Sequence, residues 1–130
     1  MKSDIANRED IQLLVNSFYD KVKVDETIGF IFSEIMQVNW EKHLPTMYDF
    51  WESTLFFTGG YHGNTMHAHR KVHDHFPLQK EHFARWLSIF KTTVDEIFEG
   101  EKATLAKQRA ESIATALQIK LFHPDPKSLL

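Results

Sequence analysis

The sequence predicts an all-α domain, and three observations lead to that prediction. Apolar residues recur at three- and four-residue steps along most of the chain, and no stretch of any length shows the alternation typical of a strand. Residues that cap or end helices stand at the borders of these stretches. The 130 residues leave room for one domain, residues 1–130, with a core over about 7–122 and a frayed tail at 123–130.

Two long helices and one short helix are expected in the N-terminal half. The first follows Asn7, a good N-cap, and runs to about Val24, with an apolar face made of Ile11, Leu14, Val15, Phe18 and Val22. Residues 25–36 form a turn and a short helix. Asn39 caps the next helix, which spans about 40–57, and Pro45 makes its first turn irregular or moves its start toward His43.

Three helices are expected in the C-terminal half. A short one begins at Asn64 or Thr65 and is limited by Pro77, and it carries four of the chain's eight histidines. A long helix covers about 79–99, with Gly100 as its C-terminal cap residue. The last helix spans about 101–122 and is stopped by two prolines.

Composition excludes several classes of protein. The net charge of -3 comes with no basic stripe, which argues against a nucleic-acid partner. No apolar run is long enough to span a membrane, and the N-terminus lacks a signal-peptide core, so we expect a cytoplasmic protein. The absence of cysteine excludes disulfides, thiolate ligands, iron–sulfur clusters and covalent haem attachment through cysteine. The seventeen aromatic residues would suit either an ordinary core or the walls around a flat apolar cofactor.

The histidines raise the question of a metal, and three kinds of site could use them. His69 and His73 lie one turn apart and would provide half of a zinc site, but zinc usually takes three or four protein ligands, and neither a thiolate nor an HExxH motif is present. A carboxylate-bridged di-iron site needs Glu-x-x-His pairs, and no glutamate precedes any histidine by three. Haem needs one axial histidine, for which His69 is the candidate and His67 and His73 are rivals.

A haem pocket also needs polar groups opposite that ligand and apolar walls around it. Tyr19, His43 and Trp86 come from three different helices and carry hydrogen-bond donors. The candidates for the walls are Phe18, Phe32, Met47, Phe50, Trp51 and Phe90.

Several spaced motifs together resemble the group III truncated haemoglobins, a bacterial branch of the globins. The resemblance runs from about residue 11 to residue 114. It rests on Phe18-Tyr19-Asp20-Lys21-Val22, Ile28-Gly29-Phe30-Ile31-Phe32, Trp40-Glu41-Lys42-His43-Leu44-Pro45, Asp49-Phe50-Trp51, Thr58-Gly59-Gly60-Tyr61-His62-Gly63-Asn64, His69 and His82-Phe83-Ala84-Arg85-Trp86-Leu87.

The resemblance implies a truncated globin, a two-over-two helical sandwich around a non-covalent haem b. Carried over by position, His69 matches the proximal iron ligand. Tyr19, His43 and Trp86 match the residues on the distal side, where a gas ligand binds. Met47 matches the residue one turn after the distal histidine, and Phe32 matches the phenylalanine that stacks on the haem.

Two positions depart from the family pattern. Gly29-Phe30 stands where the family usually has Gly-Pro, and we expect this change to loosen the joint that sets Phe32. Gly63-Asn64-Thr65 stands where the family usually has Gly-Asn-Pro, and Thr65 can replace a proline at a helix start.

Two function classes follow from the resemblance. One is a protein that binds, transports or senses oxygen. The other is an enzyme-like haem protein that detoxifies nitric oxide, as a dioxygenase, or peroxide, as a peroxidase. Such turnover would need a separate reductase, because the chain has no flavin or nicotinamide motif. Oxygen, nitric oxide and carbon monoxide are the expected ligands. A non-haem zinc module using His69 and His73 is the alternative.

Overall fold

The computed structural model describes residues 1–61, 63 and 65–122, with the side chains of residues 65 and 66 left aside. This part of the chain is built from helices and contains no strand. They are α1 (Arg8–Lys23), the short π-helix η1 (Ile31–Ile35), α2 (Trp40–Phe56), α3 (Thr65–His75), α4 (Lys80–Ile97) and α5 (Glu101–Phe122). The predicted all-α class is confirmed. The expected frayed tail at 123–130 and the expected helix start at Asn64 lie outside the described residues.

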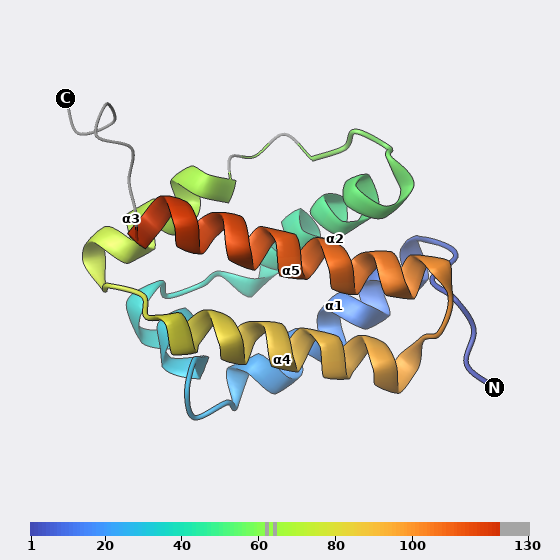
Figure 1. Ribbon diagram of the computed structural model, residues 1–130, viewed down its shortest axis with the longest axis horizontal. Coiled ribbons are helices and arrows are strands. Elements are labelled where there is room, and N and C mark those ends of the chain that lie inside the picture. Colours follow the sequence, from blue (N-terminus) through green and yellow to red (C-terminus); the bar gives the residue numbers. More distant parts are fainter. Residues whose placement is uncertain (62, 64, 123–130) are drawn as a thin grey trace.

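The helices form two layers (Figure 1). In one layer α4 lies beside α5, and in the other α1 lies beside α2. α1 packs on α4 and α2 packs on α5, while the short α3 contacts α5 near one end of the sandwich. This is the two-over-two arrangement that the resemblance implied. Among the residues that the structure describes, no helix is both long and apolar enough to cross a membrane.

Local capping explains where α1 and α2 begin. The side-chain oxygen of Asn7 accepts from the Asp10 N–H at 2.9 Å, and that of Asn39 accepts from the Glu41 N–H at 3.1 Å. Because Asn39 satisfies the first turn, α2 begins at Trp40 in spite of Pro45, which lies inside the helix. The suggested later start near His43 is therefore wrong.

Gly100 opens α5 and does not cap α4, so the prediction for this residue was wrong. α4 ends at Ile97 and the chain continues in extended backbone through Phe98, whereas the Gly100 carbonyl accepts from the Thr104 N–H at 2.9 Å. The cap of α5 comes from far away in the sequence. Both carboxylate oxygens of Asp4 accept from this helix, one from the Lys102 N–H and one from the Ala103 N–H, each at 2.9 Å.

The environment of Asp4 keeps its carboxylate charged. Burial alone would raise its pKa, but hydrogen bonds from the backbone N–H groups of Lys102, Ala103 and Ile5 outweigh that effect, and the pKa lies below its usual value. The segment before α1 is thereby fixed to the start of α5, and Ile5 is buried in the core.

The core is continuous from α1 to α5. The predicted apolar face of α1 is buried throughout. On α5 the buried positions include four alanines at helical spacing, Ala103, Ala106, Ala110 and Ala114. Small side chains there let α4 approach closely, and Phe90 and Val94 of α4 are fully buried.

The joint between α1 and η1 is tied to α4. The Asp25 side chain, 5% exposed, accepts from the Ile28 N–H at 3.1 Å and from the Arg85 guanidinium at 2.7 Å. Burial alone would raise the pKa of Asp25, but the hydrogen bonds from Arg85 and from the backbone N–H groups outweigh that effect. The pKa therefore lies below its usual value, and the side chain is held as an anion.

Phe30 makes ring contacts beyond this joint, and the expectation that it loosens the joint stays a prediction. Its ring packs edge-on against Phe76 at 5.4 Å between centroids and lies 6.5 Å from the His82 ring. Phe30 therefore ties the joint to the connection between α3 and α4. Phe32, which the joint positions, contacts Tyr19 at 5.9 Å.

Candidate functional site

A cavity of about 190 Å³ lies where all six helical elements meet. Most of its lining is apolar, with side chains from both layers of the sandwich. The polar or ring-nitrogen groups among the lining residues are few, and they are Tyr19, His43, Tyr61, His69, His82 and Trp86. An apolar cavity with a small number of convergent polar groups is the usual form of a cofactor site.

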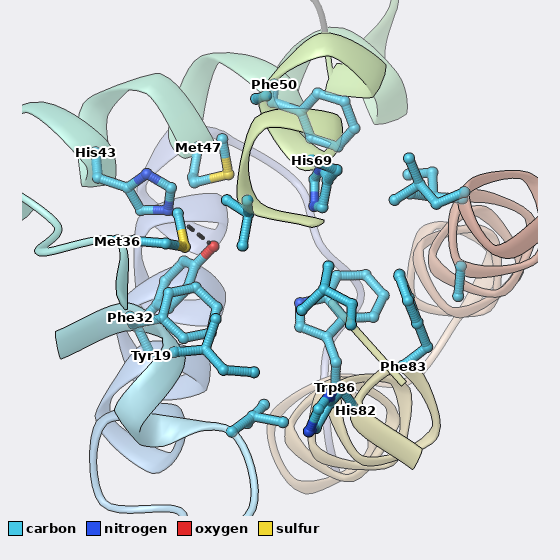
Figure 2. A pocket seen from close by; sticks show the side chains of 18 of the residues that line it. Tyr19, Phe32, Met36, His43, Met47, Phe50, His69, His82, Phe83 and Trp86 are labelled. Carbon is cyan, nitrogen blue, oxygen red and sulfur yellow. Dashed lines mark hydrogen bonds between the residues drawn. The ribbon is translucent and has the colours of Figure 1, made fainter. Parts of the chain in front are cut away.

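On one side of the cavity, Tyr19 from α1 meets His43 from α2 (Figure 2). His43 Nε2 lies 3.1 Å from the Tyr19 hydroxyl, and the tautomer of the imidazole decides which of them donates. Their rings pack edge-to-face at 5.2 Å. Helix geometry places both side chains, since each lies on the face of its helix that meets the cavity.

Burial sets the charge states of this pair. It raises the pKa of Tyr19 far above its usual value, so the hydroxyl keeps its proton. It also lowers the pKa of His43, and the positive charge that His69 can carry lowers it further. At neutral pH the pair is therefore a phenol and a neutral imidazole. Each carries one polar proton, and since the hydrogen bond between them uses one of these, the other can form a hydrogen bond in the cavity.

Trp86 enters the same cavity from α4 (Figure 2). Its ring stacks on Phe90 with centroids 5.9 Å apart and meets Phe18 edge-on at 5.9 Å. Its neighbour Arg85 is held by Asp25. The contacts with Phe90 and Phe18 fix the tryptophan in the wall of the cavity.

His69 projects into the cavity from α3 and is half-buried there (Figure 2). The rival histidines of α3 are placed elsewhere. His67 is exposed and is not in the lining. His73 is also outside the lining: its Nδ1 accepts from the Leu78 N–H at 2.9 Å, and its ring lies against Phe122. His69 is therefore the histidine of α3 that faces the cavity.

The structure gives no support to the zinc alternative. Among the described residues, no group of three or more histidine, aspartate or glutamate side chains comes together as a metal site would require. His73 does not line the cavity that His69 faces. A two-ligand pair with this arrangement is a poor zinc site.

Most of the predicted wall residues line the cavity, with one exception. Phe18, Phe32, Met47, Phe50 and Trp51 are in the lining. Phe90 is not: it is fully buried behind the wall, stacked on Trp51 at 4.7 Å and on Trp86 at 5.9 Å. Its contribution is to support those two rings.

Sequence reasoning missed part of the wall. The missed residues are Ile28, Ile31, Met36, Tyr61, Ala68, Val72, Leu78, His82, Phe83, Ile113, Ala114 and Leu117. For α5 the apolar spacing was visible, but it does not distinguish a residue packed on a neighbouring helix from one that faces a cavity. Tyr61 and His82 carried a local signal, because both stand within the family-like motifs.

The site fits a flat apolar cofactor with one axial nitrogen ligand. Aromatic and aliphatic side chains bound the cavity, and a single histidine of α3 faces the same cavity as the Tyr19–His43 pair. Haem has this requirement: a large apolar macrocycle, an iron that takes an imidazole on one side, and an open position on the other. The fold and the site together define a globin.

Comparison with known proteins agrees with that class. The family model described as bacterial-like globin matches residues 3–120, so the chain belongs to the bacterial-like globins, a family of haem proteins. Within that family it resembles the group 3 truncated hemoglobin ctb of Campylobacter jejuni, with 30% identity over 125 residues that cover 94% of this chain and 96% of the relative.

A solved structure supports the same placement. The crystal structure of the group III truncated hemoglobin from Campylobacter jejuni superposes with a TM-score of 0.82, at 30% sequence identity, and covers 96% of this chain and 98% of that one. The resemblance to group III truncated haemoglobins, and the fold it implied, are confirmed.

Proposed function

We propose that this globin holds haem b through His69 and binds oxygen and other small diatomic gases beside Tyr19, His43 and Trp86. The observation that carries the proposal is the meeting in one apolar cavity of the single inward histidine of α3 and the hydrogen-bonded Tyr19–His43 pair. The proposal treats residues 1–130 as one globin domain and retains the expected cytoplasmic location.

The bound haem would supply an iron with one open coordination position for oxygen, nitric oxide or carbon monoxide. His69 would hold the iron by one ring nitrogen. α3 is short and packs on α5, and these contacts orient the imidazole into the cavity. Phe32, Met47 and Phe50 supply apolar surface against which a macrocycle would pack.

Tyr19 would donate a hydrogen bond to a diatomic ligand that carries partial negative charge. The hydroxyl is protonated because burial raises its pKa. When His43 carries its proton on Nε2, it donates to the Tyr19 oxygen, and the tyrosine proton is left for the ligand. Donors that are fixed in place in a dry pocket cost little reorganisation, so they stabilise such charge well.

Trp86 would provide a second donor from the opposite layer, through its indole N–H. Two donors on one ligand favour slow release of oxygen. The same donors polarise an O–O bond, so nitric oxide or peroxide detoxification is compatible with the site. Either reaction would need electrons from a separate reductase.

The proposal is tested by absorption spectra of the purified protein in the ferric, reduced and carbon monoxide-treated forms. We expect a Soret band that shifts at each step in the wild type and is lost or strongly altered in His69→Ala. His67→Ala and His73→Ala are matched controls on the same helix and should keep the wild-type spectrum. A Soret band that is unchanged in His69→Ala, or absent from wild type expressed with ample haem, would sink the proposal.

A further inference from the structure

Trp40, the first residue of α2, contacts three of the cavity's side chains without lining the cavity itself. Its ring lies 5.2 Å from the Tyr19 ring, stacks on Phe32 at 6.2 Å with an interplanar angle of 21°, and meets the His43 ring edge-on at 5.6 Å. It is half-buried on the outer side of this group. Trp40 is thus a common neighbour of the residues on the Tyr19 side of the cavity.

Lys23 covers the same tryptophan. Its ammonium nitrogen lies 4.5 Å from the Trp40 ring centroid, in cation–π geometry. Lys23 follows Tyr19 by four residues on α1, and His43 follows Trp40 by three on α2, so each pair shares a helix face. The four side chains join the end of α1 to the start of α2.

This arrangement restricts His43. The imidazole is held by the Tyr19 hydroxyl at 3.1 Å and by the face-to-edge contact with Trp40. To turn away from the cavity, His43 must leave both partners. Without the indole, only the Tyr19 hydrogen bond and ring contact would hold the imidazole inward, and the space beside it would be open to water.

We propose that Trp40 is a positioning residue that keeps His43 turned into the cavity against Tyr19, and that Lys23 keeps Trp40 in place. This inference rests on the proposed function, because His43 matters here as the group beside a bound gas. It assigns a role to a residue outside the cavity. A purely structural tryptophan would change stability when replaced, but it would leave gas binding unaffected.

The test is carbon monoxide rebinding after flash photolysis, with the C–O stretching frequency of the same samples as a spectroscopic readout of His43. We expect Trp40→Leu to speed association about fivefold, the factor that corresponds to one hydrogen bond of ordinary net strength, and to shift the stretch to the value of His43→Ala. In the His43→Ala background Trp40→Leu should add no further change. Trp40→Phe keeps an aromatic face and should restore most of the wild-type behaviour.

Lys23→Met should change the rate in the same direction as Trp40→Leu, by a smaller factor. Lys21→Met is its matched control, because the Lys21 ammonium group bonds to Glu96 and Thr93, on the side of α4, and not to Trp40. Rates and stretches that stay at wild-type values in Trp40→Leu would overturn the positioning role. So would an equal effect of Trp40→Leu with and without His43.

The wild-type spectrum separates the two proposals. A wild type that shows no carbon monoxide-shifted Soret band would overturn both. A normal wild-type band with Trp40 variants that behave like wild type would overturn the positioning role alone.

Discussion

Replacing Tyr19 by phenylalanine removes one hydroxyl and little else. The ring stays buried against Phe18, Phe32 and Trp40, so the packing of the core is retained. The hydrogen bond to His43 is lost, and since His43 is only half-buried its ring nitrogen can form a hydrogen bond with water instead. We expect the free energy of unfolding to fall by about 1 kcal/mol.

The effect on oxygen should be larger than the effect on stability. A hydrogen bond to a partly charged group contributes about 1.5–3 kcal/mol. At about 1.4 kcal/mol for each factor of ten, Tyr19→Phe should release oxygen about 10 to 150 times faster. Oxygen dissociation is measured by stopped flow, with carbon monoxide as the displacing ligand.

Tyr48→Phe is the matched control for this prediction. Tyr48 on α2 also donates a hydroxyl hydrogen bond, to Asn16, but it is not among the residues that line the cavity. Its loss should leave oxygen release unchanged. The reasoning is refuted if Tyr19→Phe changes the rate by less than about twofold, or if Tyr48→Phe changes it as much.

Three further predictions concern the frame around the site. Asp4→Asn should lower the free energy of unfolding by about 1 kcal/mol at neutral pH. Because the pKa of Asp4 in the folded protein lies below its ordinary value of 3.8, wild type loses this extra stability as the pH falls through the folded pKa. Urea titrations should therefore show a smaller difference in unfolding free energy between wild type and Asp4→Asn at pH 3 than at pH 7. Gly100→Ala should lower the free energy of unfolding by at least about 2 kcal/mol, because the φ of Gly100 is +143° and an added Cβ would lie 2.5 Å from the Asp4 carboxyl carbon. Gly59→Ala is the control: with φ +72° and no atom within 4 Å of the added Cβ, it should lower the free energy of unfolding by only about 1 kcal/mol in the same titrations. Phe30→Ala should lower the melting temperature and speed loss of haem to an acceptor apoglobin, through loss of its ring contacts; an unchanged rate of haem loss would contradict a role for Phe30 in holding the joint.

The helix starts were predictable because their causes are local. Asn7 and Asn39 each satisfy a backbone donor within three residues, so the sequence around them contains all the information. The start of α5 has a different cause. Its capping carboxylate, Asp4, lies 98 residues before Lys102, and Gly100 therefore resembled an ordinary helix end in the sequence.

The cavity was predictable for side chains whose chemistry is unusual for a core. His69, Tyr19 and His43 carry groups that an apolar interior rarely holds without a reason, and the motifs around them placed them in one family. Apolar residues carry no such mark. Phe90 and Leu117 show the same helical spacing, yet Phe90 supports the wall from behind and Leu117 lines the cavity, because that choice depends on how α4 and α5 meet.

The measurement that tests the central claim most directly is imidazole rescue of His69→Gly. Removing the side chain leaves room for a free imidazole where the proposed iron ligand stood. We predict that the variant loses the wild-type ferrous spectrum and regains it in a saturable manner as imidazole is added, while His73→Gly needs no rescue. A His69→Gly protein that shows the wild-type ferrous spectrum without imidazole would contradict the assignment of His69 as the ligand.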